Sequence, residues 1–156
     1  MKTNIAVASV IRLLMLVVLG TTISSFTSPL GMDSYKVYLN DKLLFKQFMT
    51  KDAPMQTISL NENSNSDQLT VYYDHCGRIG TGRTLSLLDG QQVLKKWDYQ
   101  DTQSVQASGM VCKVGDINAF HKAGKTMKLV YDSKELSTPL TLVTIAAAGT
   151  NAKANR

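Results

Sequence analysis

The chain has 156 residues, a length that fits one domain and leaves no room for a second catalytic domain. Hydrophobic residues make up 44% of it and charged residues 19%, which excludes a largely disordered protein. The net charge of +5 includes Lys2 and Arg12, and the +3 of the remainder is too mild to indicate a nucleic-acid partner.

The first 25 residues have the three parts of a secretory signal peptide. Lys2 and Arg12 supply positive charge, residues 13–19 (LLMLVVL) form an apolar run, and small residues follow it. The apolar run is far shorter than the ~20 residues of a membrane-spanning helix, although a retained anchor is the alternative interpretation. We therefore expect export to the periplasm or the cell exterior, with no stable membrane span after signal removal.

The first part of the mature chain alternates apolar and polar residues, as β-strands do. Residues 35–49 predict a hairpin around a two-residue Asn40-Asp41 turn, in which Val37 would pair with Leu44. Residues 57–60 and 69–74 predict two further strands. Between them, residues 61–67 (NENSNSD) lack the glycine and glutamate of a calcium-binding EF-hand loop and indicate a solvated turn.

The segment from residue 85 to residue 97 predicts a second hairpin. Leu85, Leu87, Val93 and Trp97 all have odd numbers, and a simple two-residue turn would place them on different faces. A bulged three-residue turn containing Asp89-Gly90 would keep them together and point Trp97 inward. Lys95 would then share the inner face, so we expect it near an edge of the sheet.

The last third predicts three strands and one short helix. A strand would hold Cys112 on a buried face, and Asp116 would cap the helix, which Gly124 would end after His121. Two strands follow, over residues 127–131 and 140–147, and residues 150–156 have nothing to bury. We find no internal sequence repeat. About eight strands and one helix predict an all-β fold, an antiparallel β-sandwich over residues 26–149, with a β-barrel as the alternative.

The two cysteines suggest a disulfide bond, as is usual in exported chains. A bond between Cys76 and Cys112 would contribute about 3 to 4 kcal/mol, whereas the alternative is that both are small buried hydrophobic residues. His75, Cys76, Cys112 and His121 lack the paired spacings of a zinc site, and neighbouring strand residues point to opposite faces. We expect no metal and no cofactor.

Aromatic residues supply the one candidate ligand surface. Tyr72, Trp97 and Tyr99 carry rings of the kind that stack on sugars, although such rings more often pack inside a sheet protein. Asp74 stands beside His75, but no spacing of carboxylates identifies a catalytic pair. We therefore assign no catalytic residue.

The segments YKVYLNDKLLFKQ and QLTVYYDHCGRIG, followed by a strand ending KKW, resemble small uncharacterised secreted β-sandwich proteins of the Bacteroidota. The resemblance implies no activity. We expect a non-enzymatic interaction or structural module whose partner is an unknown protein or a glycan, contacted through loops or by adding a strand to a sheet edge. The alternatives are a carbohydrate-binding module and a small secreted hydrolase, which would need a cleft around Asp74 and His75.

Overall fold

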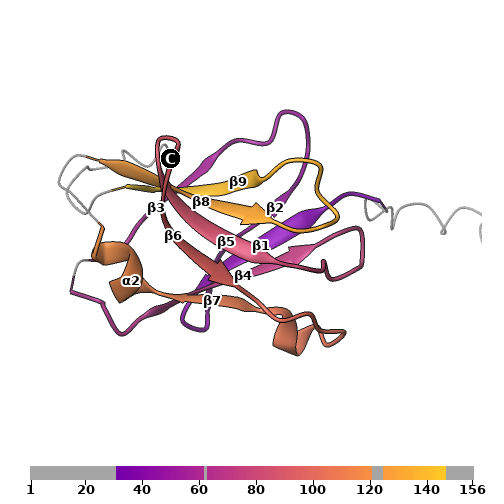
Figure 1. Cartoon of the computed structure of the whole chain (residues 1–156), viewed down its shortest axis with the longest axis horizontal. Coiled ribbons are helices and arrows are strands. Elements are labelled where there is room, and N and C mark those ends of the chain that lie inside the picture. The colour runs from indigo at the N-terminus through magenta and orange to yellow at the C-terminus, as the bar shows by residue number, and fades with distance from the viewer. Residues whose placement is uncertain (1–30, 62, 121–124, 147–156) are drawn as a thin grey trace, which may run out of the picture. The chain divides into compact units, whose positions relative to one another are not determined.

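A computed structural model describes residues 31–61, 63–120 and 125–146, and within them the chain forms nine strands and two short helices (Figure 1). The expected signal peptide, the tail at 150–156, His121 and Gly124 lie outside the described residues. In chain order the elements are β1 (Ser34–Leu39), β2 (Lys42–Phe48), β3 (Gln56–Ser59), β4 (Gln68–Asp74), β5 (Thr84–Asp89), β6 (Gln92–Asp98), the 3-10 helix η1 (Gln106–Ser108), β7 (Met110–Lys113), α2 (Val114–Asn118), β8 (Thr126–Asp132) and β9 (Leu140–Ala146).

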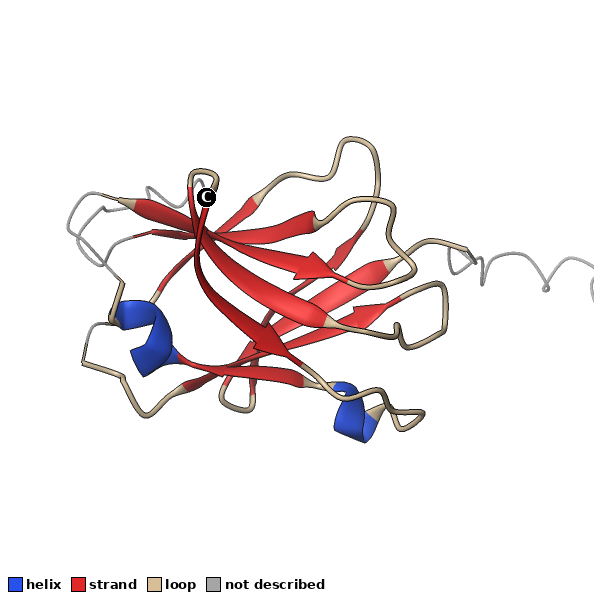
Figure 2. Cartoon of the chain, viewed as in Figure 1, coloured by secondary structure: helices blue, strands red, loops and turns tan. Residues whose placement is uncertain are grey.

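The strands form two sheets, which confirms the predicted β-sandwich over the barrel (Figure 2). One sheet has the order β2-β1-β4-β7 and the other β3-β9-β8-β5-β6. Every pair is antiparallel except β3 with β9. Neither sheet closes on itself, so each keeps two edge strands.

The core lies between the sheets because alternate residues of each strand point inward. Val37, Val71 and Leu85 are fully buried, as are Leu129 and Tyr131 of β8. The Tyr35 hydroxyl donates a hydrogen bond of 2.5 Å to the Leu142 carbonyl in the opposite sheet. The sandwich is therefore joined by a polar contact as well as by apolar packing.

The two hairpins have the same register, fifty residues apart. Val37 pairs with Phe45 and Leu87 pairs with Lys95, and after one bulge in each hairpin the last pairs before the turn are Leu39 with Lys42 and Asp89 with Gln92. Each turn begins with a residue of positive φ, 53° at Asn40 and 61° at Gly90. The hairpins share a backbone plan that their sequences do not reveal.

The structure corrects both predicted hairpin registers. The Asn40-Asp41 turn has the expected two residues, but a bulge makes Val37 pair with Phe45 rather than with Leu44. The second turn is also of two residues, Gly90-Gln91, because Asp89 pairs with Gln92. The extra residue sits inside β6 instead, between the partners of Leu87 and Leu88.

That bulge decides which side chains of β6 point inward. Trp97 pairs with Leu85 and packs against the core, as predicted. Val93 lies beyond the bulge, pairs with Leu88 and is 55% exposed, so its predicted place on the inner face is wrong. Lys95 lies on edge strand β6 as expected, with its ammonium 5.5 Å from the centre of the Trp97 ring.

The helix after β7 begins earlier than predicted. Its N-cap is Lys113, which makes no side-chain capping hydrogen bond, and Asp116 lies in its first turn. The Asp116 carboxylate pairs with Lys95 at 2.9 Å instead of capping, and the hydrogen bond from Lys95 lowers the pKa of Asp116. The helix thus connects β7 to the edge strand β6 of the other sheet.

Candidate ligand-binding groove

A groove of about 390 Å³ lies over the outer face of the four-stranded sheet. Its volume is in the range of small-ligand sites. Even-numbered residues of β1 and β4 point outward because their odd-numbered neighbours fill the core. The side chains lining the groove come from both strands, from β2 and from two loops, and they include Lys36, Tyr38, Lys46, Tyr72, Arg78 and Val105.

A row of three residues crosses the sheet beneath the groove. Lys46 of β2 is directly opposite Lys36 of β1, and Lys36 is directly opposite Tyr72 of β4. The Lys46 ammonium lies 4.5 Å from the centre of the Phe48 ring. Two like charges opposite each other on neighbouring strands destabilise a sheet. Within the described residues, neither lysine is paired with a carboxylate.

The corresponding positions of the other sheet look different. Because the two hairpins share one register, Ser86 and Lys96 correspond to Lys36 and Lys46. Here only one lysine is present, and it lies 3.7 Å from the Asp98 carboxylate. The uncompensated positive pair is thus specific to the sheet that carries the groove.

Two tyrosine rings lie beside the lysine pair. Tyr38 and Tyr72 meet edge to face, with 5.7 Å between ring centres, a preferred geometry for aromatic pairs. Gly109 allows the tip of the Tyr72 ring to approach the chain closely, because a Cβ atom there would come within 2.9 Å of the Tyr72 Cζ and hydroxyl oxygen. Both tyrosines are half-buried, which leaves part of each ring facing the groove.

Arg83 fixes the loop that forms one wall of the groove. Its side chain is buried, and its two terminal nitrogens donate hydrogen bonds of 2.6 Å to the carbonyls of Gln100 and Ser108. Ser108 and Val105 lie at the groove, so the guanidinium holds this wall from behind. The buried Nε of Arg83 finds no hydrogen-bond partner among the described residues.

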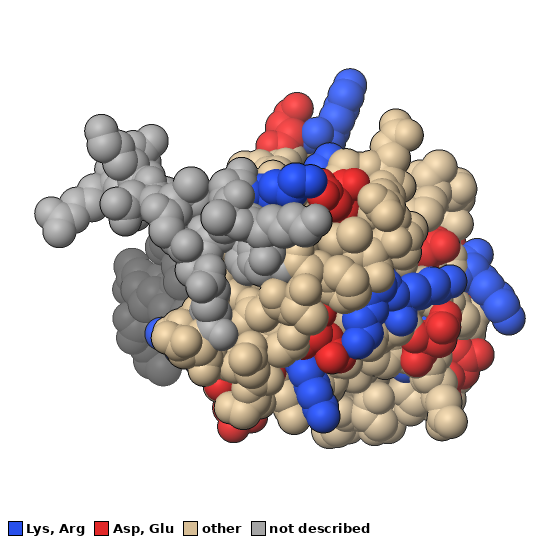
Figure 3. Space-filling view, turned by 60° about the vertical axis from the view of Figure 1, so that its left-hand side comes forward, with Lys and Arg blue, Asp and Glu red and all other residues tan. Residues whose placement is uncertain are grey.

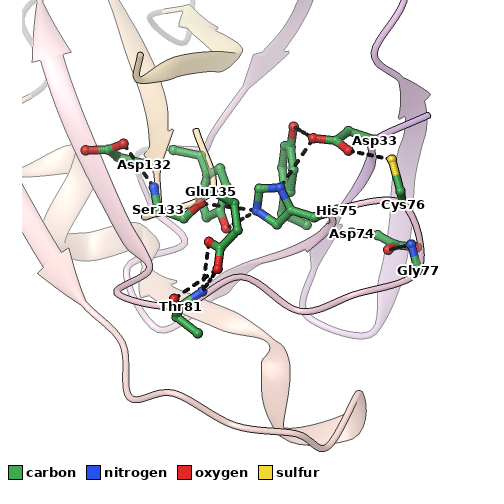
Figure 4. A network of polar contacts seen from close by, with 11 residues as sticks. Asp33, Asp74, His75, Cys76, Gly77, Thr81, Asp132, Ser133 and Glu135 are labelled. Atoms are coloured by element: carbon green, nitrogen blue, oxygen red, sulfur yellow. Dashed lines mark hydrogen bonds and ion pairs between the residues drawn. The ribbon is translucent and has the colours of Figure 1, made fainter. Parts of the chain in front are cut away.

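A buried polar network lies inside the same end of the sandwich (Figure 4). His75 Nδ1 is 3.3 Å from an oxygen of Asp33, and Nε2 is 3.0 Å from the Tyr131 hydroxyl and 3.2 Å from Ser133 Oγ. A carboxylate only accepts, so we assign the proton to Nδ1, which leaves the single lone pair of Nε2 as an acceptor for one of the two hydroxyls. The Tyr73 hydroxyl donates a hydrogen bond to the same carboxylate at 3.0 Å. Burial raises the pKa of Tyr73, and this hydrogen bond raises it further.

The network has the order of a carboxylate, an imidazole and a serine hydroxyl, which in hydrolases activates the serine. Here the serine has no room for a substrate. His75 and Ser133 are 7% and 6% exposed, and a Cβ atom at Gly80 would lie 2.7 Å from His75 Nε2. His75 follows β4 and Ser133 follows β8, so the network ties the ends of the two sheets together.

Glu135 closes the loop over this network from outside. Its carboxylate accepts hydrogen bonds from the Thr81 amide at 3.0 Å and from the Thr81 hydroxyl at 2.9 Å. Desolvation acts to raise the pKa of Glu135, but these hydrogen bonds outweigh it and hold the pKa at about 2. The carboxylate thereby anchors the glycine-rich loop at residues 77–82.

The expected disulfide bond is wrong, because both cysteines are free. Cys112 pairs with Leu69 at the start of β4, whereas Cys76 lies beyond its end, seven residues further along. At about 3.3 Å per residue the two are about 23 Å apart, far beyond the Cα separation that a disulfide bridges. Cys76 instead donates to Asp33 at 3.1 Å, and burial raises the pKa of Cys112 to about 12.

The structure separates the three predicted aromatic residues. Tyr72 lines the groove, whereas Trp97 and Tyr99 pack against the core. The Tyr99 hydroxyl donates to the Val111 carbonyl at 2.8 Å. Asp74 reaches the groove, but one oxygen accepts the Gly77 amide at 2.5 Å, and His75 does not line the groove.

Sequence reasoning missed Lys36, Tyr38, Lys46 and Arg78. Successive side chains of a strand point to opposite faces, so Lys36 points outward where Tyr35 and Val37 are buried. This orientation was predictable from the sequence. That Tyr72 lies next to Lys36 depends on β4 pairing with β1, which the sequence does not specify. Predicting this site would have required the order of the strands in the sheet.

None of the helices in the described part of the chain has the length and apolar character needed to cross a bilayer, and no three potential metal-binding side chains gather within those residues. Figure 3 shows one face of the molecule, on which basic and acidic side chains are interspersed.

Comparison with protein-family models, with curated proteins and with solved structures found no match.

Proposed function

We propose that this protein is an exported, non-enzymatic binding module that holds its ligand in the groove on the four-stranded sheet. The supporting observation is the coincidence, at one groove, of two half-exposed tyrosine rings with two lysines that have no carboxylate partner among the described residues. Like charges directly opposite each other on neighbouring strands reduce stability, and the ring faces beside them can stack on a ligand.

The strand edges are less suited to binding a partner. The longer edge strands, β2 and β6, each contain a bulge and two lysines, devices that discourage the addition of another strand. The remaining edges, β3 and β7, have only four residues each. These features favour the groove over strand addition as the working surface.

A carbohydrate-binding module is the second candidate, favoured by the position of Tyr72 in the groove. A hydrolase has weaker support, since Ser133 and His75 are sealed by the Gly80 backbone. Hydrolysis also requires donors aimed at an oxyanion beside an accessible nucleophile.

The proposal is tested by binding the mature protein to arrays of neutral glycans, acidic glycans and acidic peptides. We expect retention of at least one class, loss of that signal in Tyr72→Ala, and an unchanged signal in Lys96→Ala. Lys96 is the matched control because it has the hairpin position of Lys46 on the other sheet. Absence of any binder, or binders indifferent to Tyr72→Ala, would contradict the proposal.

A further inference from the structure

The lysine pair beneath the groove indicates a negatively charged ligand. Lys36 and Lys46 face each other across neighbouring strands, and Arg78 lines the same groove. None of the three forms an ion pair within the described residues. Asp74, the one acidic residue among the described residues that line the groove, accepts a hydrogen bond from the Gly77 amide. An anion placed here would relieve the repulsion between the lysines and gain charge-assisted hydrogen bonds.

The groove presents side chains along its floor. β1 is paired on both sides over its whole length, whereas β4 is paired with β7 only through Gln68–Val71. The amides and carbonyls of β1 are therefore already used, and a ligand above this strand meets side chains, namely rings and cations.

The rings favour a sugar. Tyr38 and Tyr72 meet edge to face at an interplanar angle of 79°, so their faces do not form a continuous stacking surface for successive bases. A ring face of this kind suits the C–H face of a single pyranose. The groove volume of about 390 Å³ also suits one or two sugar residues better than a longer strand.

We infer that the groove binds an acidic glycan, with a uronate carboxylate between Lys36 and Lys46 and a sugar ring against Tyr72. This inference rests on the proposed function, because it names the ligand class for the same groove. In the equivalent hairpin Lys96 has the Asp98 carboxylate 3.7 Å away, whereas the position that corresponds to Asp98 is Phe48, so Lys46 has no carboxylate there.

The experiment measures binding by calorimetry to oligogalacturonate, with neutral gluco-oligosaccharides, oligo-glutamate and oligo-dT as comparison probes. We expect oligogalacturonate to bind and to weaken as salt is raised, since the attraction is electrostatic. Lys36→Gln and Lys46→Gln should each reduce the affinity about tenfold, the loss of one charge-assisted hydrogen bond. Lys96→Gln should leave it unchanged.

Stability separates a binding role from a structural one. Lys36→Gln relieves the like-charge contact, so the melting temperature of the free protein should stay equal or rise while the affinity falls. Lys46→Gln also removes the contact with the Phe48 ring, so the stability comparison uses Lys36→Gln. A merely structural lysine would lower the melting temperature. The melting temperature of Tyr72→Ala, measured in the same way, shows whether that variant is folded when its binding is tested.

The outcomes distinguish the two proposals. Binding of a neutral glycan, oligo-glutamate or oligo-dT that depends on Tyr72, without binding of oligogalacturonate, would overturn the acidic-glycan inference and leave the binding module standing. Oligogalacturonate binding that Lys36→Gln and Lys46→Gln do not weaken would overturn the inference as well. If none of the four probes binds and the arrays are also empty, both proposals fail.

Discussion

Replacing Arg83 by methionine tests whether a buried guanidinium holds the groove wall. The substitution keeps a long side chain but removes two hydrogen bonds of 2.6 Å, to the carbonyls of Gln100 and Ser108. Hydrogen bonds to a charged group contribute about 1.5 to 3 kcal/mol each. Methionine recovers part of that sum, because it needs no desolvation of a charge and removes the unpaired buried Nε.

The net loss should be about 2 to 3 kcal/mol, which lowers the melting temperature by roughly 6 to 10 °C for a domain of this size. Urea unfolding can be followed by the fluorescence of Trp97, the single tryptophan of the chain. The exposed Arg78 is the matched control, and Arg78→Met should change stability by less than about 0.5 kcal/mol. A variant at Arg83 as stable as the wild type would refute the reasoning.

Three further predictions follow from buried or hydrogen-bonded groups. Tyr35→Phe leaves the Leu142 carbonyl without its donor, so we expect a loss of about 1 to 2 kcal/mol in urea unfolding, and no loss would mean that the inter-sheet bond contributes nothing. The folded pKa of Glu135, about 2, lies below its ordinary value of 4.5, so its stabilisation is present above pH 4.5 and is lost as the pH falls towards 2. Glu135→Gln should therefore cost about 1 kcal/mol at pH 7, after allowance for solvent screening, and nothing at pH 2; a difference that does not depend on pH would refute this. Alkylation of the unreduced protein should modify Cys76 in the folded state and Cys112 only after unfolding, and the absence of both thiols in mass spectra of the denatured protein would restore the disulfide.

Strand positions were predictable because burial on one face imposes a two-residue period. Val37, Leu69 and Leu129 lie in the core where their alternation placed them. The parity of Leu85 and Trp97 even required an irregularity in the second hairpin, and one exists. Its location was not predictable, because a bulge inside β6 and a longer turn satisfy the same parity for these two residues.

The residues of the candidate site were harder to predict because their neighbours belong to other strands. Cys112 lies in β7, which pairs with β4, and Cys76 follows β4. The two cysteines are nevertheless far apart, because Cys112 is opposite the start of β4 and Cys76 lies beyond its end. Tyr72 was recognised as exposed enough to bind, but its neighbours Lys36 and Lys46 were not. Long-range register is set by packing of the whole sandwich rather than by local propensity.

The two hairpins show that one backbone pairing can display different sets of side chains. Both use the same pairing, the same bulge position and a turn opened by a residue of positive φ, although their side chains differ almost throughout. Outward-facing positions can therefore change without disturbing the backbone that displays them. The four-stranded sheet carries Lys36 and Tyr38 where the five-stranded sheet carries Ser86 and Leu88. Substituting those two residues of the five-stranded sheet would therefore test whether it can display a second binding surface.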